Sequence, residues 1–209
     1  MLLDLDGVVR HFDEALTAAL EVEHELAEGA ILAAAFAPDI PGDLTCGRNT
    51  EAEWIAAVGS VLGSTAAAEA WGSSPGTVDA DVLAVVDQVR AGGVPVGILT
   101  NGTDRLATEL AALGVEDRFD RVFNSAKIGW AKPDVRTFAS ACESLGLAPP
   151  RVAFTDDTPT KLVGAVELGM PTHPFVDAAS LSTWLVDLGV LPQREGGLRP
   201  VPTSGTMDP

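Results

Sequence analysis

Apolar runs alternate with amphipathic segments over most of the chain after residue 76. Apolar runs predict a buried strand at 94–100 and another strand at 152–155, and two further short strands are predicted near 121–125 and at 172–176. Between and after these runs, helical spacing of the apolar residues predicts helices at about 79–91, 104–113, 133–145, 160–168 and 179–188. Strands that alternate with helices indicate a parallel sheet with helices on both faces, which is an α/β fold.

The amino-terminal residues predict one more strand. Residues 1–9 have the pattern of a short strand followed by a tight turn at Gly7. Only three residues precede Asp4, so either the start of the sequence is assigned too late or this strand is unusually short. About 90 residues separate it from the next strand, and most of them have a helical pattern. A crossover between parallel strands needs one helix, so the excess predicts a helical insertion over the carboxyl edge of the sheet.

Within this insertion the pattern predicts three helices, at 13–36, from about Thr50 to Val61, and at 64–71. Thr50 and Glu53 have the spacing of a capping box. In the first helix the apolar residues share one broad face, made of Leu16, Ala19, Leu20, Ala27, Ile31 and Leu32. Its glutamates are expected to face solvent, namely Glu21, Glu23, Glu25 and Glu28.

Three segments of the chain follow from this pattern. We expect a core made of residues 1–12 and 77–192, and a helical insertion made of residues 13–76. The remaining residues, 193–209, are rich in Pro, Gly and polar side chains, and we expect them to be a disordered tail.

Charge and composition restrict the possible partners. The 209 residues carry a net charge of -17, from 30 acidic and 13 basic side chains, which repels nucleic acid and anionic lipid. Phosphate esters are repelled as well, so an enzyme that acts on them would need local Lys or Arg side chains and a metal ion. Two distant cysteines and three scattered histidines indicate neither disulfides nor a zinc site. With no signal peptide and no membrane-spanning apolar run, we expect a cytoplasmic location and no membrane partner.

Polar side chains that could carry chemistry follow the predicted strands, at the edge where ligands bind in open α/β sheets. Asp4 and Asp6 lie two positions apart, so their carboxylates point the same way and could bind a hard cation, attack phosphorus or move a proton. On its own, this D-x-D-G motif is equally consistent with an acidic turn.

Three further motifs lie at later strand ends. Thr100-Asn101 could hydrogen-bond a phosphoryl oxygen, although a strand-to-helix turn capped by Thr103 explains it as well. Lys132 precedes a proline at the first turn of a helix and could project a fixed charge, or could be an ordinary surface lysine. Asp156-Asp157 ends an apolar strand, where adjacent carboxylates repel each other unless a cation joins them; a helix cap is the alternative.

The order of these motifs, D-x-D-G, T-N-G, K-P-D and D-D, each after a strand, resembles the haloacid-dehalogenase-like (HAD) superfamily of hydrolases. The match spans about residues 2–176. It implies a Rossmann-like parallel sheet with the first strand central and the second and fourth strands on either side. It also implies that the insertion is the small helical cap that this superfamily carries after its first motif, which opens for substrate and closes to exclude water.

The resemblance assigns roles to the carboxylates. Asp4 would be the nucleophile and form an aspartyl-phosphate, and Asp6 would protonate the leaving oxygen and then activate water. Mg²⁺ would be held by the Asp4 carboxylate, the Asp6 backbone carbonyl and Asp156 or Asp157. Dehalogenases of the superfamily generally lack the second aspartate, because a halide leaves without a proton, so Asp6 favours phosphoryl transfer.

Other residues would complete the site. Thr100 and the Asn101 backbone would hold the phosphoryl group, and Lys132 would balance its charge. Lys161 lies where relatives often carry a small polar residue, and it could add positive charge or face solvent. Candidate substrate contacts are Arg10, Arg48, Asn49 and Trp54.

The expected activity is Mg²⁺-dependent hydrolysis of a small phosphorylated metabolite. A phosphosugar mutase is an alternative enzyme, and a non-catalytic binding protein that keeps the fold is the alternative from another class. The sequence does not identify the substrate, and a homodimer through the cap stays open.

Overall fold

The computed structural model describes residues 1–37, 40 and 44–193. Its main sheet is parallel and has the order β5-β4-β1-β6-β7. The strands are β1 (Leu2–Leu3), β4 (Gly97–Thr100), β5 (Arg121–Asn124), β6 (Phe154–Asp156) and β7 (Thr172–Pro174). The short first strand is central, between the second and fourth strands of this sheet, as the family resemblance implies. The predicted α/β fold is confirmed.

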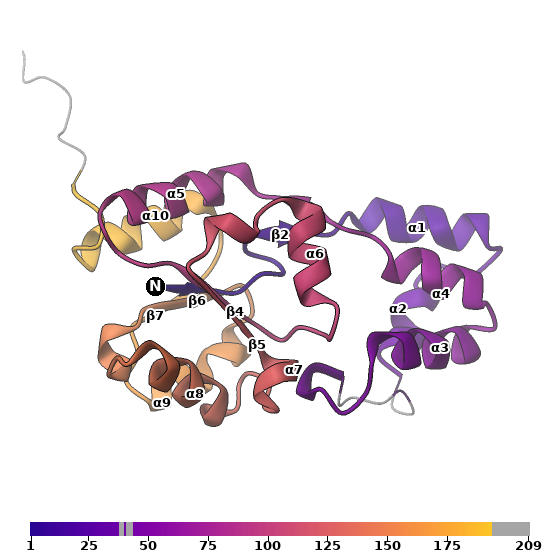
Figure 1. Ribbon diagram of the computed structural model, residues 1–209. Coiled ribbons are helices and arrows are strands. Elements are labelled where there is room, and N and C mark those ends of the chain that lie inside the picture. Colours follow the sequence, from indigo (N-terminus) through magenta and orange to yellow (C-terminus); the bar gives the residue numbers. More distant parts are fainter. Residues whose placement is uncertain (38–39, 41–43, 194–209) are drawn as a thin grey trace, which may run out of the picture.

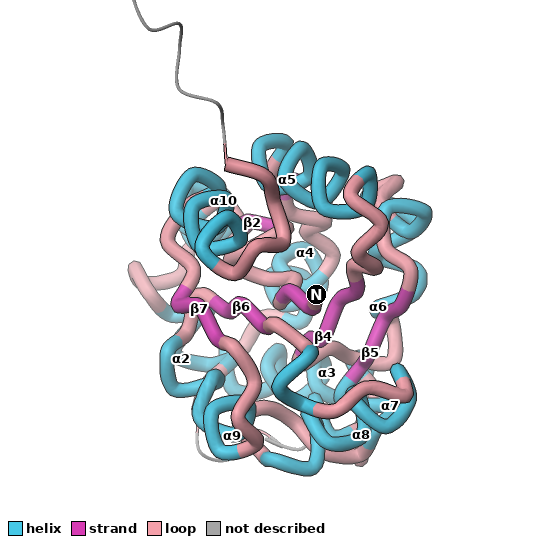
Figure 2. The backbone as a smooth tube through the Cα atoms, turned by 90° about the vertical axis from the view of Figure 1, so that its left-hand side faces the viewer, coloured by secondary structure: helices cyan, strands magenta, loops and turns pink. Residues whose placement is uncertain are grey.

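Helices cover both faces of the sheet (Figures 1 and 2). One face carries α5 (Ala80–Ala91), α6 (Leu106–Leu113) and α10 (Ala178–Asp187). The other carries α7 (Ser125–Ile128), α8 (Val135–Leu145) and α9 (Val163–Glu167). Successive residues of β1 alternate between the two layers, because Leu3 packs with the first group and Leu2 with the second. In the described part of the chain, four 3₁₀ turns connect elements, at Leu44–Cys46, Glu116–Arg118, Pro149–Arg151 and Pro159–Leu162.

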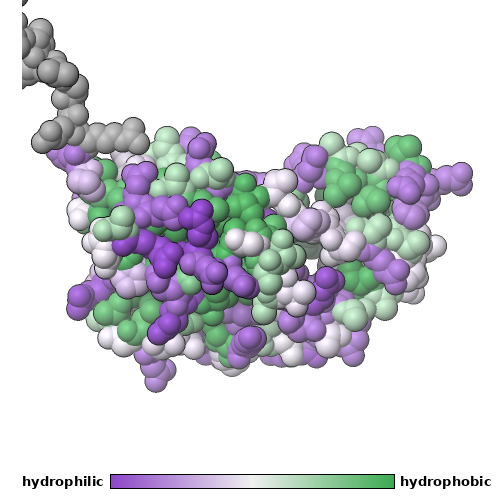
Figure 3. All heavy atoms as spheres, turned by 45° about the horizontal axis from the view of Figure 1, so that its top comes forward, coloured by the Kyte–Doolittle hydropathy of each residue, from purple (hydrophilic) through white to green (hydrophobic). Residues whose placement is uncertain are grey.

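A second group of helices forms a separate lobe beyond the sheet (Figure 1). We call it the helical lobe; it consists of α1 (Glu14–Glu23), α2 (Ala30–Ala35), α3 (Glu51–Leu62) and α4 (Thr65–Gly72). It has its own small apolar core, made of Ala34, Ala35, Ile40, Val58 and Ala68. The capping box at Thr50 and Glu53 is present, as predicted. The space-filling view shows a narrow gap between this lobe and the sheet lobe (Figure 3).

Two short strands join the lobes, and the sequence did not predict them. Strands β2 (Arg10–His11) and β3 (Thr77–Val78) pair antiparallel. Two-residue strands have no recognisable alternation, and their partners lie more than sixty positions apart. They place both connections to the helical lobe side by side.

The predicted helix at 13–36 is wrong, because the chain breaks there into α1 and α2. Glu25 (φ 55°) and Gly29 (φ 78°) adopt left-handed conformations, which a continuous right-handed helix excludes. Glu21, expected to face solvent, is buried, and its carboxylate accepts hydrogen bonds from the backbone N–H groups of Gly29 (2.9 Å) and Ile31 (3.0 Å). A buried carboxylate thus replaces the helical hydrogen bonds that are lost at the break.

The predicted apolar face of this segment is only partly buried. Leu20 and Ile31 are buried, but Leu16 is 41% exposed and Leu32 is 47% exposed. Ala19 and Ala27 are also exposed. Because the segment forms two helices, a face drawn along a single axis does not correspond to one buried surface.

Several predicted boundaries also shift. Helix α8 begins at Val135, since the Asp134 side chain caps it, so Pro133 precedes the helix instead of standing in its first turn. Helix α6 is preceded by Arg105 at its N-cap, and not by Thr103. The tail from 194 onward lies outside the described residues. Over the described part of the chain, no helix has the length and apolar character needed to cross a membrane.

Candidate active site

Asp4 lies at the carboxyl end of the central strand and is buried. Its backbone N–H donates to the carbonyl of Thr155 (2.9 Å), which fixes it between β1 and β6. Its Oδ1 accepts from the Leu5 N–H (2.7 Å) and lies 2.9 Å from the Lys132 ammonium, and its Oδ2 lies 3.7 Å from that of Lys161. Burial alone would raise the pKa of Asp4, but the two lysines outweigh it and hold the pKa below its ordinary value. This carboxylate is therefore charged and available as a nucleophile at neutral pH.

Lys132 joins two buried carboxylates. Its fully buried ammonium lies 2.9 Å from Asp4 Oδ1 and 2.6 Å from Asp156 Oδ2. The Asn101 carboxamide holds the backbone of Lys132 from both sides, because Nδ2 donates to the Lys132 carbonyl (2.9 Å) and Oδ1 accepts from its N–H (2.7 Å). The sequence did not predict this positioning role for the Asn101 side chain, since the contact joins two loops thirty-one positions apart.

Asp4, Asp156 and Asp157 form an acidic cluster. One carboxylate oxygen of each lies within 4.8 Å of the others. Asp156 is buried, and its Oδ1 accepts from the Thr158 N–H (2.9 Å). Burial and the neighbouring Asp4 raise the pKa of Asp156 to about 6, although Lys132 opposes the shift. Three convergent carboxylates are a donor set for a hard cation.

Gly7 allows Asp157 to approach this cluster. The residue has φ of 83°, and a Cβ built there would lie 2.2 Å from Asp157 Oδ2. Glycine is thus required for the turn and also for the space that the Asp157 carboxylate occupies.

Asp6 lies at the mouth of the site, and Arg10 holds it. The Arg10 guanidinium donates from Nε to Asp6 Oδ1 (2.6 Å) and from another nitrogen to Glu109 Oε2 (2.8 Å). Burial raises the pKa of Asp6, and its bond to Arg10 only partly offsets this. Asp6 therefore keeps its proton to a higher pH than an ordinary aspartate does. Such a carboxyl group is suited to act as a general acid and then as a general base.

A family model of haloacid dehalogenase-like hydrolases matches residues 1–169. The chain belongs to this family of hydrolases. Its sheet order and the strand-end positions of its motif residues agree with the expectations that the resemblance raised, and the enzyme class is confirmed.

Two curated relatives have different activities in their names. A phosphatase from Mycobacterium tuberculosis is 33% identical over 95 residues, which are 44% of this chain and 44% of that protein. An (S)-2-haloacid dehalogenase from Burkholderia cepacia is 30% identical over 93 residues, which are 44% of this chain and 40% of that protein. The matches thus span less than half the length of these relatives.

The fold is shared with solved structures over most of the chain. A HAD family enzyme from Bacteroides thetaiotaomicron, in complex with magnesium and inorganic phosphate, superimposes with a TM-score of 0.68 at 23% identity. The superposition covers 82% of this chain and 91% of that one. At 23% identity, this similarity shows a shared fold and nothing about the substrate.

A cleft of about 720 Å³ lies between the two lobes of this HAD-like hydrolase. Asp6 and Asn101 line it on the sheet side, and most of its remaining wall comes from the helical lobe and the segment leading into it. Two of the four candidate substrate contacts line this cleft, Arg10 and Trp54. Arg48 and Asn49 lie in the loop before α3, outside the cleft lining within the described part of the chain.

Glu51, at the start of α3, ties the helical lobe to the sheet lobe. Its buried carboxylate accepts from the Thr103 hydroxyl (2.6 Å) and pairs with Arg105 (2.9 Å). In return, the Glu51 N–H donates to the Asp104 side chain (2.9 Å). These bonds end on the loop that follows Thr100, so the lobe is anchored beside a motif residue of the site. Thr100 itself is buried at the end of β4.

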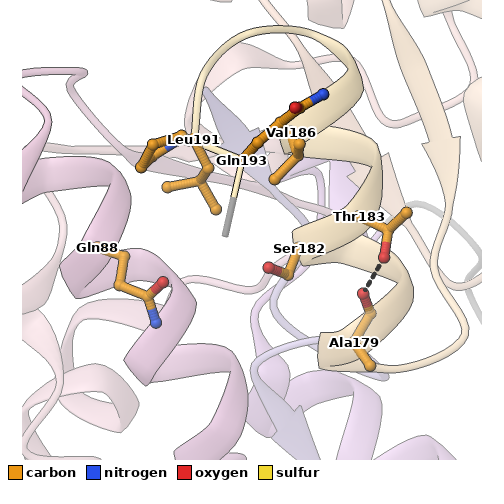
Figure 4. Close-up of a pocket in the computed structure, with 8 residues that line it drawn as sticks. Gln88, Ala179, Ser182, Thr183, Val186, Leu191 and Gln193 are labelled. Carbon is orange, nitrogen blue, oxygen red and sulfur yellow. Dashed lines mark hydrogen bonds between the residues drawn. The ribbon is translucent and has the colours of Figure 1, made fainter. Parts of the chain in front are cut away.

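A second cavity, of about 420 Å³, lies between α5 and α10 (Figure 4). Its lining within the described residues has no charged side chain, and its polar side chains are those of Gln88, Ser182, Thr183 and Gln193. None of the motif residues reaches it, so it has no part in the candidate active site.

Proposed function

We propose that this HAD-like hydrolase is a Mg²⁺-dependent phosphatase, which hydrolyses a small phosphate monoester through an aspartyl-phosphate. The observation that carries the proposal is a pair of aspartates at the end of the central strand: Asp4, which is buried, and Asp6, which lines the cleft. Asp4 is held ionised by two lysines, and Asp6 beside it has a raised pKa and faces the cleft. A nucleophile and a separate proton donor are what the ester reaction needs.

In the first step, a carboxylate oxygen of Asp4 attacks phosphorus and the bond to the leaving oxygen breaks. The Asp6 carboxyl gives its proton to that oxygen, and the alcohol departs into the cleft. In the second step, Asp6 takes a proton from water, which attacks phosphorus and breaks the bond to Asp4. Inorganic phosphate leaves, Asp4 is again ionised and Asp6 again carries a proton.

The acidic cluster fits a divalent cation. Its donors are carboxylate oxygens, which Mg²⁺ prefers, and Lys132 and Lys161 leave the cluster with an unbalanced negative charge. We infer that Asp4, the Asp6 backbone carbonyl and Asp156 or Asp157 hold Mg²⁺. When bound, the cation would neutralise phosphoryl oxygens as phosphorus is attacked.

We also propose roles for the residues around the phosphoryl group. Thr100, buried at the end of β4, and the Asn101 backbone are the donors to its oxygens, and Lys132 compensates its charge. The carboxamide of Asn101 is engaged with the Lys132 backbone, which supports a backbone role for Asn101 toward substrate.

The helical lobe acts as the cap in this proposal. The two antiparallel linkers and the Glu51 contacts define how it sits over the site. Trp54 contacts the leaving group, and Arg10 positions Asp6. Arg48 and Asn49 stay candidates that would need a shift of their loop to reach substrate.

The test is phosphate release from p-nitrophenyl phosphate and a panel of phosphorylated metabolites, with Mg²⁺ and with EDTA. Wild-type protein should release phosphate only with Mg²⁺, and the Asp4→Asn variant should release none above background. Full activity in that variant would overturn the proposed nucleophile. Chloride release from a 2-haloacid, with no turnover of esters, would favour a dehalogenase instead.

A further inference from the structure

The cleft beside Asp6 has an apolar wall. Four large apolar side chains that line it are exposed in this structure: Phe12 (50%), Leu16 (41%), Leu32 (47%) and Phe36 (79%). Among the described residues between 12 and 78, the two other large apolar side chains with exposure above 40% are Val22 and Val61. Exposed apolar side chains that converge on one cavity, instead of being scattered, indicate a ligand site.

Two tryptophans extend this wall. Trp54 from α3 and Trp71 from α4 both line the cleft, and their ring centroids lie 5.7 Å apart with a tilt of 39°. The cleft volume of about 720 Å³ is within the range of small-molecule sites. Several aromatic side chains in the lining of such a space favour a flat or bulky apolar body.

Among the described residues that line the cleft, no cationic side chain is left uncommitted for a second anion. Arg10 is the one cationic side chain among the described lining residues, and it is 5% exposed and committed to Asp6 and Glu109. Residues 38–39 and 41–43, which are not described, contain no Lys or Arg. A carboxylate or second phosphate in the cleft would meet six lining carboxylates.

These carboxylates are not arranged for a cationic ligand either. Five of the six already accept from donors within the protein, namely Asp6, Asp13, Glu21, Glu51 and Glu109. The sixth, Glu14, is exposed at the start of α1. What the cleft presents to a ligand is therefore its apolar surface.

We propose that the substrates of this enzyme are phosphate monoesters with a single anionic group, whose leaving alcohol carries an uncharged aromatic or aliphatic body that packs against Phe12, Phe36, Trp54 and Trp71. This inference rests on the proposed phosphatase function. Within that function it excludes phosphoglycolate-like acids and sugar bisphosphates as preferred substrates.

Matched esters test the inference. With Mg²⁺ present, kcat/KM is measured for methyl, ethyl, butyl and hexyl phosphate, for benzyl phosphate, for phosphoglycolate and for a sugar bisphosphate. The alkyl esters share similar leaving-group chemistry, so their trend reports binding in the cleft. We expect kcat/KM to rise by up to about fourfold per added methylene, and phosphoglycolate to fall at least about tenfold below ethyl phosphate.

Variants locate the effect. Phe36→Ala should flatten the dependence of kcat/KM on chain length. Because Phe36 is 79% exposed, the variant should keep the wild-type melting temperature, which is measured in parallel. Val22→Ala is the matched control, because Val22 is 80% exposed outside the cleft lining, and it should keep the wild-type dependence. Leu16→Ala provides a second cleft variant on the same helix as the control.

The possible outcomes distinguish a failure of the proposed substrate preference from a failure of the proposed phosphatase function. A flat chain-length dependence in the wild type, or a preference for phosphoglycolate or the bisphosphate, would overturn the inference and leave the phosphatase standing. Hydrolysis of none of these esters, p-nitrophenyl phosphate included, would overturn the phosphatase and the inference together. A preserved dependence in both cleft variants would show that the chain binds elsewhere.

Discussion

Removing the buried ammonium of Lys132 provides a strong test of the charge arrangement. Lys132→Met keeps most of the side-chain volume but leaves Asp4 and Asp156 facing each other without the cation that now lies 2.9 and 2.6 Å from them. All three side chains are at most 2% exposed, so water cannot replace the lost charge. Breaking a buried pair of this kind costs about 3–5 kcal/mol of the unfolding free energy.

Urea unfolding at pH 7 in EDTA measures this loss. Arg118→Met is the control, because Arg118 and Asp87 form an exposed pair at 2.6 Å whose removal should cost at most about 1 kcal/mol. Added Mg²⁺ should restore part of the stability of Lys132→Met, since it would supply positive charge to the same carboxylates. A loss no larger than that of the control would refute the reasoning.

The same variant should depend on pH in a defined direction. Without Lys132 the pKa values of Asp4 and Asp156 rise, so the folded state takes up protons that the unfolded state lacks. The stability lost in the variant should therefore shrink as the pH falls from 7 to 5. A loss that grows at low pH would mean that the carboxylates do not repel each other in the folded protein.

Three further changes have defined outcomes. Glu51→Gln should lower the unfolding free energy by about 1.5–3 kcal/mol and speed hydrogen exchange around Arg105, because the charged bonds between the lobes weaken; unchanged exchange there would contradict this. Gly7→Ala should weaken Mg²⁺ binding by about tenfold in calorimetry, since its Cβ displaces Asp157 and its φ disfavours Ala. The apparent Mg²⁺ affinity should fall by about tenfold per pH unit below about 6, where Asp156 becomes protonated, and a flat profile from pH 5 to 7 would disprove that competition.

The sequence was sufficient to predict the sheet and the residues at its carboxyl edge. Apolar runs mark the strands, and each motif residue follows one of them. The strand order that places Asp4, Thr100 and Asp156 at neighbouring strand ends came from the resemblance, and the pairing of β1 with β4 and β6 agrees with it. The reach of Lys132 into this cluster was predicted by the resemblance, and not by periodicity. The carboxamide clamp of Asn101 could not be predicted, because it depends on the relative positions of two loops.

The helical lobe was harder to predict, for a physical reason. Its first segment bends at Glu25 and Gly29, and only Gly29 is a residue that signals a break. Burial of Glu21 becomes favourable only once its carboxylate can accept from the backbone after the bend. Helical periodicity identified the apolar residues of this segment, but it could not separate those that pack inside the lobe, such as Ile31, from those that face the cleft, such as Leu16.

The strong acidity of the chain also becomes compatible with an anionic substrate once charges are considered locally. Asp4, Asp156 and Asp157 converge near two ammonium groups, those of Lys132 and Lys161, so one negative charge remains unbalanced. A phosphate dianion would be repelled by that arrangement and attracted once a divalent cation reverses its sign. The cleft beyond offers the rest of the ester no comparable attraction for charge, because the one guanidinium among its described lining residues, that of Arg10, already pairs with two carboxylates. Affinity for the phosphoryl group and selection of the leaving group are thus assigned to different physical effects, electrostatic attraction at the strand ends and apolar contact in the cleft.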